Sequence, residues 1–161
     1  MNAIPFSMTS PPEVRDAFSI SAINALREMM QLDSYAHHDM TEHTVKTDAD
    51  LIVAAIQLAR TKPGELRLVL SDELALQFAA KYLGDDVELS AEMADDLAGE
   101  LANVIAGQAK TMLKGSDYHF LMTSPVVTRV SGYPGTIPLS IIECEYGTFF
   151  MELQLERCPG S

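Results

Sequence analysis

Residues 90–115 read SAEMADDLAGELANVIAGQAKTMLKG. Ser90 can cap the start of a helix and Gly115 can stop it, so the pattern predicts a long helix from Ser90 to about Lys114. At 100° per residue, one arc of that helix gathers most of its large apolar residues and is the predicted core side. This arc holds Met93, Leu97, Leu101, Val104, Gln108 and Met112.

The opposite arc of the same helix is small and polar, and it holds Asp96, Gly99, Glu100, Asn103, Gly107 and Lys110. Glu100 and Asn103 are three residues apart, so their side chains are neighbours on the helix surface. Each interior glycine costs about 1 kcal/mol relative to alanine, which suggests that another backbone approaches this face closely. The alternative is a solvated face whose glycines pack against a neighbouring helix of the same domain.

The segments on either side of this helix predict a sheet. Nearly continuous apolar sequence or period-two alternation predicts strands at Leu51–Leu58, Leu66–Leu70, Pro125–Val130, Pro138–Tyr146 and Thr148–Glu156. A helix capped by Ser71 or Asp72 runs to about Leu83, and a first helix runs from Ser10 to near Asp33. Between that helix and the first strand, a polar stretch offers a short edge strand around Glu42–Lys46.

This order of elements predicts an α+β domain, with helices packed on one sheet. The first and third helices carry Ser21-Ala-Ile-Asn24 and Glu100-Leu-Ala-Asn103, and a β-hairpin follows each of them. This similarity covers only a few residues, so a pseudo-two-fold duplication of the chain stays a hypothesis.

Composition narrows the functional classes. A length of 161 residues predicts one domain, with residues 1–11 expected to form a loose arm. The 11 Lys and Arg against 23 Asp and Glu give a net charge of −12. This charge argues against binding nucleic acid or an anionic membrane surface. The longest apolar run, Leu51–Ile56, is far too short to span a membrane, and no secretory signal is visible, so a cytoplasmic location is expected. Two cysteines are too few for a disulfide framework.

Two clusters of titratable residues are candidate sites. His37, His38, Asp39 and His43 could suggest a metal site, but adjacent side chains on an extended chain point to opposite faces, and a solvated loop or edge strand is favoured. We therefore predict no metal site. The seven acids between Lys81 and Lys110 indicate a solvated run, or a surface that steers toward a basic patch on a partner. They are Asp85, Asp86, Glu88, Glu92, Asp95, Asp96 and Glu100.

Residues 99–110 resemble the active-site helix of the CheX/CheC/FliY chemotaxis phosphatases, and most closely the CheX branch. Three further stretches agree with this family: residues 64–84, Ser124-Pro125-Val126-Val127 with Gly132, and the terminal hairpin. The resemblance extends from about Gly64 to Leu155. It implies a CheC/CheX-like fold, which is an antiparallel-rich mixed sheet with two long helices packed on one face.

The resemblance also implies a function, which is hydrolysis of the aspartyl phosphate of a CheY-type response regulator in two-component signalling. In the family's Glu-x-x-Asn motif, Asn103 would position the attacking water and Glu100 would engage a lysine of the regulator. The partner surface would include Asp96, Gly99, Gly107 and Lys110. No cofactor is expected on this chain, because Mg²⁺ belongs to the regulator, and the family implies a homodimer joined through its sheet.

Two rival hypotheses remain open. The chain could be a non-catalytic module of the same fold that binds a receiver domain or a flagellar-switch partner. It could also be an unrelated α+β scaffold, which a buried Glu100 face would favour. Ser21 replaces the glutamate of a second motif, so Asn24 is not expected to form a second working site.

Overall fold

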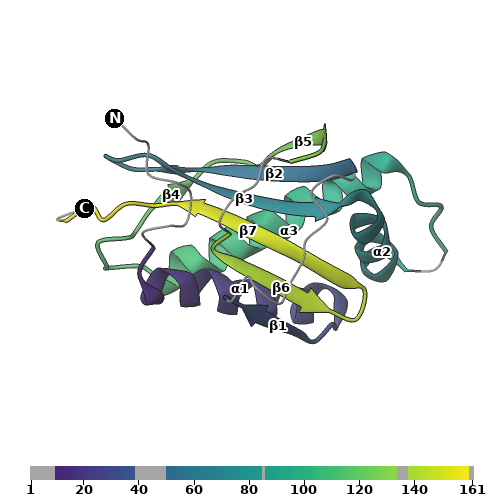
Figure 1. Ribbon diagram of the computed structural model, residues 1–161, viewed down its shortest axis with the longest axis horizontal. Helices are drawn as coiled ribbons and strands as arrows, with labels where there is room; N and C mark the ends of the chain where they lie inside the picture. Colours follow the sequence, from purple (N-terminus) through teal and green to yellow (C-terminus); the bar gives the residue numbers. More distant parts are fainter. Residues whose placement is uncertain (1–9, 39–49, 85, 134–137, 160–161) are drawn as a thin grey trace.

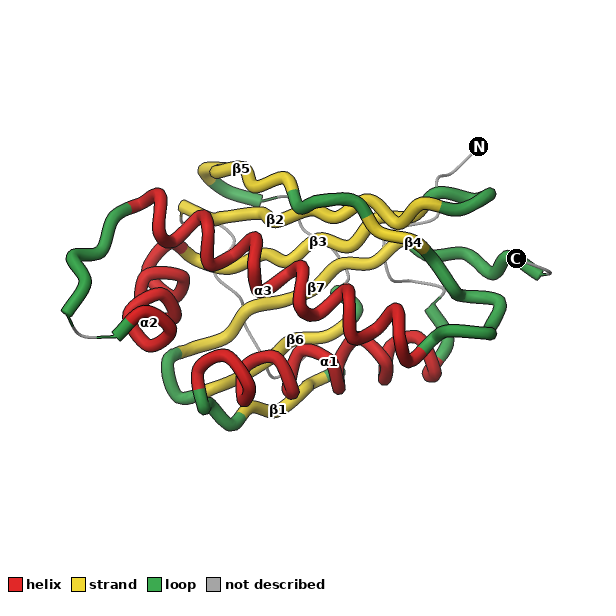
Figure 2. The backbone as a smooth tube through the Cα atoms, turned by 180° about the vertical axis from the view of Figure 1, so that it is seen from behind, coloured by secondary structure: helices red, strands yellow, loops and turns green. Residues whose placement is uncertain are grey.

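In the described residues, three helices cover one face of a seven-stranded sheet (Figures 1 and 2). The computed structural model describes residues 10–38, 50–84, 86–133 and 138–159. The helices are α1 (Pro12–Met30), α2 (Asp72–Leu83) and α3 (Ala91–Met112). The strands are β1 (Ser34–His37), β2 (Asp50–Ala59), β3 (Gly64–Ser71), β4 (Leu121–Met122), β5 (Val126–Ser131), β6 (Ser140–Cys144) and β7 (Gly147–Gln154). This is the α+β class that the sequence predicts.

The strand order has the two-fold pattern expected of a duplication. Along the sheet the order is β1-β6-β7-β3-β2, and the short β4 and the longer β5 both pair with β2. Exchanging α1, β1, β2 and β3 for α3, β5, β6 and β7 reverses this order onto itself. The pseudo-axis passes between β3 and β7, which pair with Leu68 opposite Met151. All pairings among the described strands are antiparallel.

The main core lies between the sheet and the helices. Phe149, Met151 and Leu153 of β7 alternate toward α1 and α3, as the period-two pattern predicts. Phe78 of α2 packs edge-on against Phe149, with ring centroids 6.1 Å apart. The Ser71 side chain accepts a hydrogen bond from the Leu74 backbone N–H at 3.0 Å, which confirms Ser71 as the cap of α2.

The opposite face of the sheet also buries side chains, which the alternating pattern alone does not predict. Val69 and Phe150 are at most 1% exposed there and belong to a second apolar cluster. Glu152, on the same face of β7, is only 2% exposed. Its carboxylate accepts a hydrogen bond from the Tyr133 hydroxyl and lies 3.7 Å from the Arg67 guanidinium, so the buried charge has partners.

The first third of the chain departs most from prediction. The first helix ends at Met30 rather than near Asp33, because Gln31 takes a left-handed conformation with φ of 55°. A strand, β1, begins directly afterwards at Ser34 and pairs with β6, where the sequence suggested a polar loop. The edge strand that we expected around Glu42–Lys46 lies outside the described residues, and so does nearly all of the expected N-terminal arm.

Candidate functional site

Helix α3 carries the predicted site and lies beside α1, with its strand contacts made to β2, β3, β4 and β5 (Figure 2). Ser90 caps it by accepting a hydrogen bond from the Met93 backbone N–H at 3.3 Å. Its buried side is rich in alanine, which lets the helix lie close to the strands. The fully buried residues of this side are Ala94, Ala98, Leu101, Ala102, Ile105, Ala106 and Ala109.

The predicted core side of α3 was therefore rotated from the observed one. Leu97 and Leu101 are buried as predicted, but Met112 is 48% exposed. Met93, Val104 and Gln108 are only partly buried. The Gln108 amide donates a hydrogen bond at 3.0 Å to Glu28 of α1, so this side borders the neighbouring helix. The prediction placed the core side where the large apolar residues lie, whereas the alanines form the side that contacts the sheet.

Gly99 is buried, so it does not lie on the exposed partner surface in which the sequence analysis placed it. A β-carbon at this position would lie 3.2 Å from Cγ2 of Val127 and 3.6 Å from Cγ of Pro125. The glycine therefore serves a close approach between α3 and the start of β5 inside the domain. Gly107 differs, because a β-carbon there would meet nothing within 4 Å.

Arg129 of β5 links the first turns of α3 to the sheet and to α2 through hydrogen bonds and ion pairs. Its Nε donates to Asp95 at 2.9 Å, its Nη1 donates to Asp72 at 2.6 Å, and its Nη2 donates to the Ala91 carbonyl at 3.1 Å. The hydrogen bond to Asp72 raises the pKa of Arg129, and the charge of Asp95 adds to this effect. The beginning of the site helix is thus held by charge-assisted bonds.

Glu100 and Asn103 follow on the outer side of α3. Glu100 is exposed and Asn103 is partly exposed, and neither forms a hydrogen bond or ion pair with a described residue. Their positions on the helix are about 4.5 Å apart along its axis, as three residues require. A carboxylate and an amide are therefore presented side by side with their hydrogen-bonding groups uncommitted.

A hollow of about 470 Å³ opens beside Glu100, between α3 and the end of α2. Its acidic wall is formed by Asp96 and Glu100, and its apolar wall by Tyr82, Leu83, Met93 and Leu97. Tyr82 and Leu83 are 46% and 43% exposed, so both side chains are accessible at the wall of the hollow. Neither residue could be singled out from the sequence, because the hollow exists only where the end of α2 meets α3.

The other predicted partner-surface residues are spread along the exposed side of α3. Asp96 lies on the rim of the hollow. Gly107 and Lys110, further along the helix, are partly exposed. Most of the acidic run is also on the surface: Asp86, Glu88, Glu92, Asp96 and Glu100 are exposed, and Asp95 is engaged by Arg129. Asp85 lies outside the described residues.

The corresponding pair in α1 is arranged differently. Ser21, in the place of Glu100, is fully buried, and its hydroxyl lies 3.6 Å from the Met112 sulfur. Asn24 is partly exposed but has no acidic neighbour at position 21. This burial supports the expectation that α1 does not form a second site.

The histidine cluster is only partly described. His37 lies in β1 with its Nε2 3.7 Å from a carboxylate oxygen of Glu143, and His38 is exposed, whereas Asp39 and His43 lie outside the described residues. In the described part of the chain, no three potential metal ligands gather into a group. Among the described helices, none combines the length and the apolar character needed to cross a bilayer.

A family model described as "Chemotaxis phosphatase CheX" matches residues 52–142, which is more than half of the chain. The matched segment begins in β2, ends in β6 and includes the whole of α3. No curated protein matches the chain in sequence.

Solved structures match the fold over nearly the whole chain. The chemotaxis protein CheX from Vibrio vulnificus is 23% identical with a TM-score of 0.72, and the match covers 91% of this chain and 100% of that one. A CheC-like superfamily protein from Shewanella sp. PV-4 is 26% identical with a TM-score of 0.69, covering 91% and 99%. The chain matched in a CheX–CheY–BeF₃–Mg²⁺ complex from Borrelia burgdorferi is 18% identical with a TM-score of 0.62, covering 88% and 97%.

Proposed function

The chain belongs to the CheX family of chemotaxis phosphatases, and from this premise we propose that it hydrolyses the aspartyl phosphate of a CheY-type receiver domain. Family membership supports phosphatase activity in general. The complex of a CheX with CheY, BeF₃ and Mg²⁺ supports a receiver domain as the partner class.

One observation carries the assignment of the site. Glu100 and Asn103 are neighbours on an exposed side of a helix that the family model covers, and neither side chain is used by the described part of the fold. A helix that buried its Glu100 face would have favoured an unrelated scaffold, and Glu100 is exposed.

Asn103 is proposed to hold the attacking water. An amide cannot accept a proton at neutral pH, so this residue cannot be a general base, but its oxygen and NH₂ group can fix a water by two hydrogen bonds. Phosphoryl transfer passes through a loose transition state that needs position more than activation. A hundredfold acceleration requires about 2.7 kcal/mol, which is within the range of positioning effects.

Glu100 is proposed to engage a lysine of the receiver domain. Its carboxylate is exposed and has no cation partner among the described residues, so it is available to a visiting ammonium group. The acidic wall that it shares with Asp96 would attract the same positive charge. The metal expected on the receiver domain needs no ligand from this chain.

The test is a turnover assay with a CheY-type receiver domain phosphorylated by acetyl phosphate. Substoichiometric wild-type protein should accelerate the release of inorganic phosphate by about a hundredfold, which corresponds to about 2.7 kcal/mol. Asn103→Ala should abolish the acceleration without altering the circular dichroism spectrum. The matched control is Asn24→Ala, which removes the corresponding amide from α1 and should retain activity.

A second pair of variants tests whether Glu100 contributes to binding of the receiver domain. Glu100→Ala should weaken binding to the receiver domain, whereas Glu92→Ala, which removes an exposed acid from the first turn of the same helix, should bind nearly as wild type. Full activity of Asn103→Ala would refute the water-positioning role. Stoichiometric binding with no turnover by the wild type would instead identify a non-catalytic binding module.

A further inference from the structure

The hollow beside Glu100 is apolar inside and accessible from the surface. Leu97, which lines it, is 3% exposed, whereas Tyr82 and Leu83 line it with much of their surface uncovered. Helix α2 ends directly after these two residues, because Gly84 takes a φ of 94° that residues with a side chain rarely adopt. The last turn of α2 therefore presents two large apolar side chains next to the proposed site.

The rim of this hollow is acidic. Asp96 and Glu100 both line it and are exposed, and none of the described residues that line it is basic. Arg129 is committed to ion pairs at the first turns of α3, and Lys81 of α2 does not line the hollow. A carboxylate is costly to cover without a partner, so a molecule that fills the hollow must bring positive charge with it.

A receiver domain that engages Glu100 must also cover this hollow, because Glu100 forms part of its wall. Specific protein interfaces bury about 800 Å² on each partner, which is far more than the carboxylate of Glu100 and the amide of Asn103 can supply. In such interfaces, large side chains that fill pockets near the centre carry much of the binding energy. The hollow therefore offers the apolar contact that the polar pair lacks.

We propose that the hollow receives an apolar side chain of the receiver domain that has a lysine or arginine beside it, and that Tyr82 and Leu83 thereby select the receiver domain. This inference rests on the proposed function, since it names a further contact with the same partner. An apolar occupant without the cation would leave the carboxylates of Asp96 and Glu100 unpaired, and an acidic occupant would be repelled. Tyr82 and Leu83 contribute to affinity and not to the chemical step.

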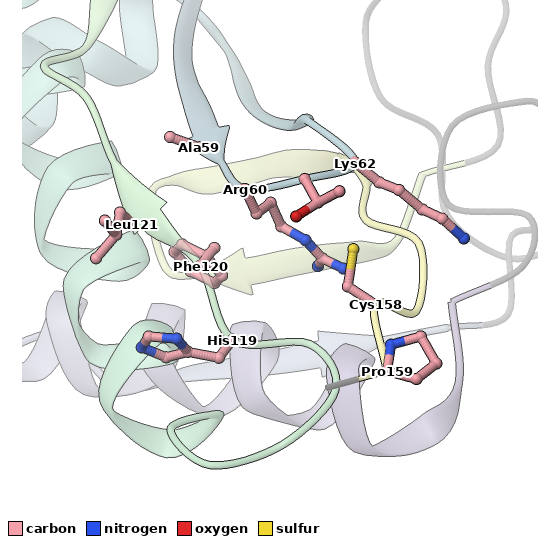
Figure 3. Close-up of a pocket in the computed structure, with 9 residues that line it drawn as sticks. Ala59, Arg60, Lys62, His119, Phe120, Leu121, Cys158 and Pro159 are labelled. Carbon is pink, nitrogen blue, oxygen red and sulfur yellow. The ribbon is translucent and has the colours of Figure 1, made fainter. Parts of the chain in front are cut away.

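The test is the affinity for a CheY-type receiver domain that carries Mg²⁺ and BeF₃, a phosphate mimic that is not hydrolysed. Tyr82→Ala and Leu83→Ala should each weaken binding by about tenfold, because each removes apolar area that the partner buries. Tyr82→Phe keeps the ring and should bind within about twofold of the wild type. The matched control is Leu121→Ala, which should bind as the wild type. Leu121 is 59% exposed and lines a separate hollow with Arg60 and Phe120 (Figure 3).

Two further measurements separate the apolar contact from the charge. The losses in Tyr82→Ala and Leu83→Ala should persist at high salt, whereas the loss in Glu100→Ala should shrink, because salt screens charges. Leu83→Lys should weaken binding more than Leu83→Glu, since the occupant brings positive charge. The reverse order of these two variants would overturn the basic chemistry of the occupant.

The remaining outcomes distinguish this inference from the proposed function. Wild-type affinity in both Tyr82→Ala and Leu83→Ala would overturn the role of the hollow, and turnover by the wild type would still support the phosphatase. Weakened binding in these variants without turnover by the wild type would instead overturn only the phosphatase. Failure of the wild type to bind the receiver domain would overturn both. A change in self-association of Tyr82→Ala, measured by sedimentation with receiver affinity unchanged, would assign the hollow to a second copy of this chain.

Discussion

Gly99 of α3 lies against Val127 of β5 so closely that a β-carbon on the glycine would be 3.2 Å from the valine Cγ2 atom. This contact sets how near the site helix approaches the sheet, one turn before Asn103. It separates the two interior glycines of α3, because the space beside Gly107 is open. Packing within the domain explains why residue 99 is glycine, but it does not explain the glycine at position 107.

The two glycines therefore predict opposite responses to alanine. Gly107→Ala should raise the free energy of unfolding by about 0.5–1 kcal/mol, because alanine favours a helix and its methyl group meets no neighbour. Gly99→Ala gains the same helix propensity but must displace Val127, so it should be less stable than Gly107→Ala. Urea denaturation of both variants measures the difference. Equal stabilities would show that the β5 contact does not require glycine.

Gly107 also tests the predicted partner surface. If a receiver domain approaches α3 closely beside Asn103, Gly107→Ala should weaken its binding while the free protein becomes more stable. Isothermal titration with a phosphorylated receiver domain measures this affinity, and Thr111→Ala, one turn further on the exposed side, is the control. Unchanged affinity of Gly107→Ala would remove Gly107 from the partner surface.

Arg129 predicts a salt-dependent contribution to the stability of the site helix. Arg129→Gln removes the bonds to Asp72 and Asp95 and should lower the free energy of unfolding by about 1 kcal/mol, since both pairs are partly exposed. The difference from the wild type should shrink in high salt, because salt screens the charges. Arg27→Gln, which removes the more exposed pair with Asp33 at 3.6 Å, should have a smaller effect. A loss that does not depend on salt would contradict an electrostatic role.

The elements with strong local signals could be predicted from the sequence. Ser71 caps α2, Gly84 ends it, and the residues of β7 alternate between the two faces of the sheet as predicted, because each feature depends on a few neighbouring residues. The edge strand β1 could not be predicted, since its pairing with β6 joins residues more than 100 positions apart. Similarly, the buried side of α3 depends on where the sheet lies, and alanine gives only a weak signal of burial.

The same distinction between local and long-range features applies to the candidate site. The spacing of Glu100 and Asn103 is local, so their common side of α3 could be predicted from the helix period. The hollow with Tyr82 and Leu83 could not, because it forms where the end of α2 meets α3. The burial of Gly99 depends on Val127, which is 28 residues away, and no local pattern reveals such a contact.

Tyr133 predicts a loss of stability in alkaline solution. Burial, together with the hydrogen bond to Glu152, raises the pKa of Tyr133 from 10.0 to about 12. Because the folded protein holds the phenol proton more tightly than the unfolded chain, this contribution to stability is complete below pH 10.0 and declines as the pH rises toward 12.

The measurement is urea denaturation across this range for the wild type and Tyr133→Phe, together with a difference titration of tyrosinate absorbance. Tyr133→Phe should be less stable at neutral pH, because buried Glu152 loses a donor, and should lack the part of the alkaline decline that belongs to Tyr133. Identical alkaline profiles for the two proteins would show that the phenol proton is not held by this contact.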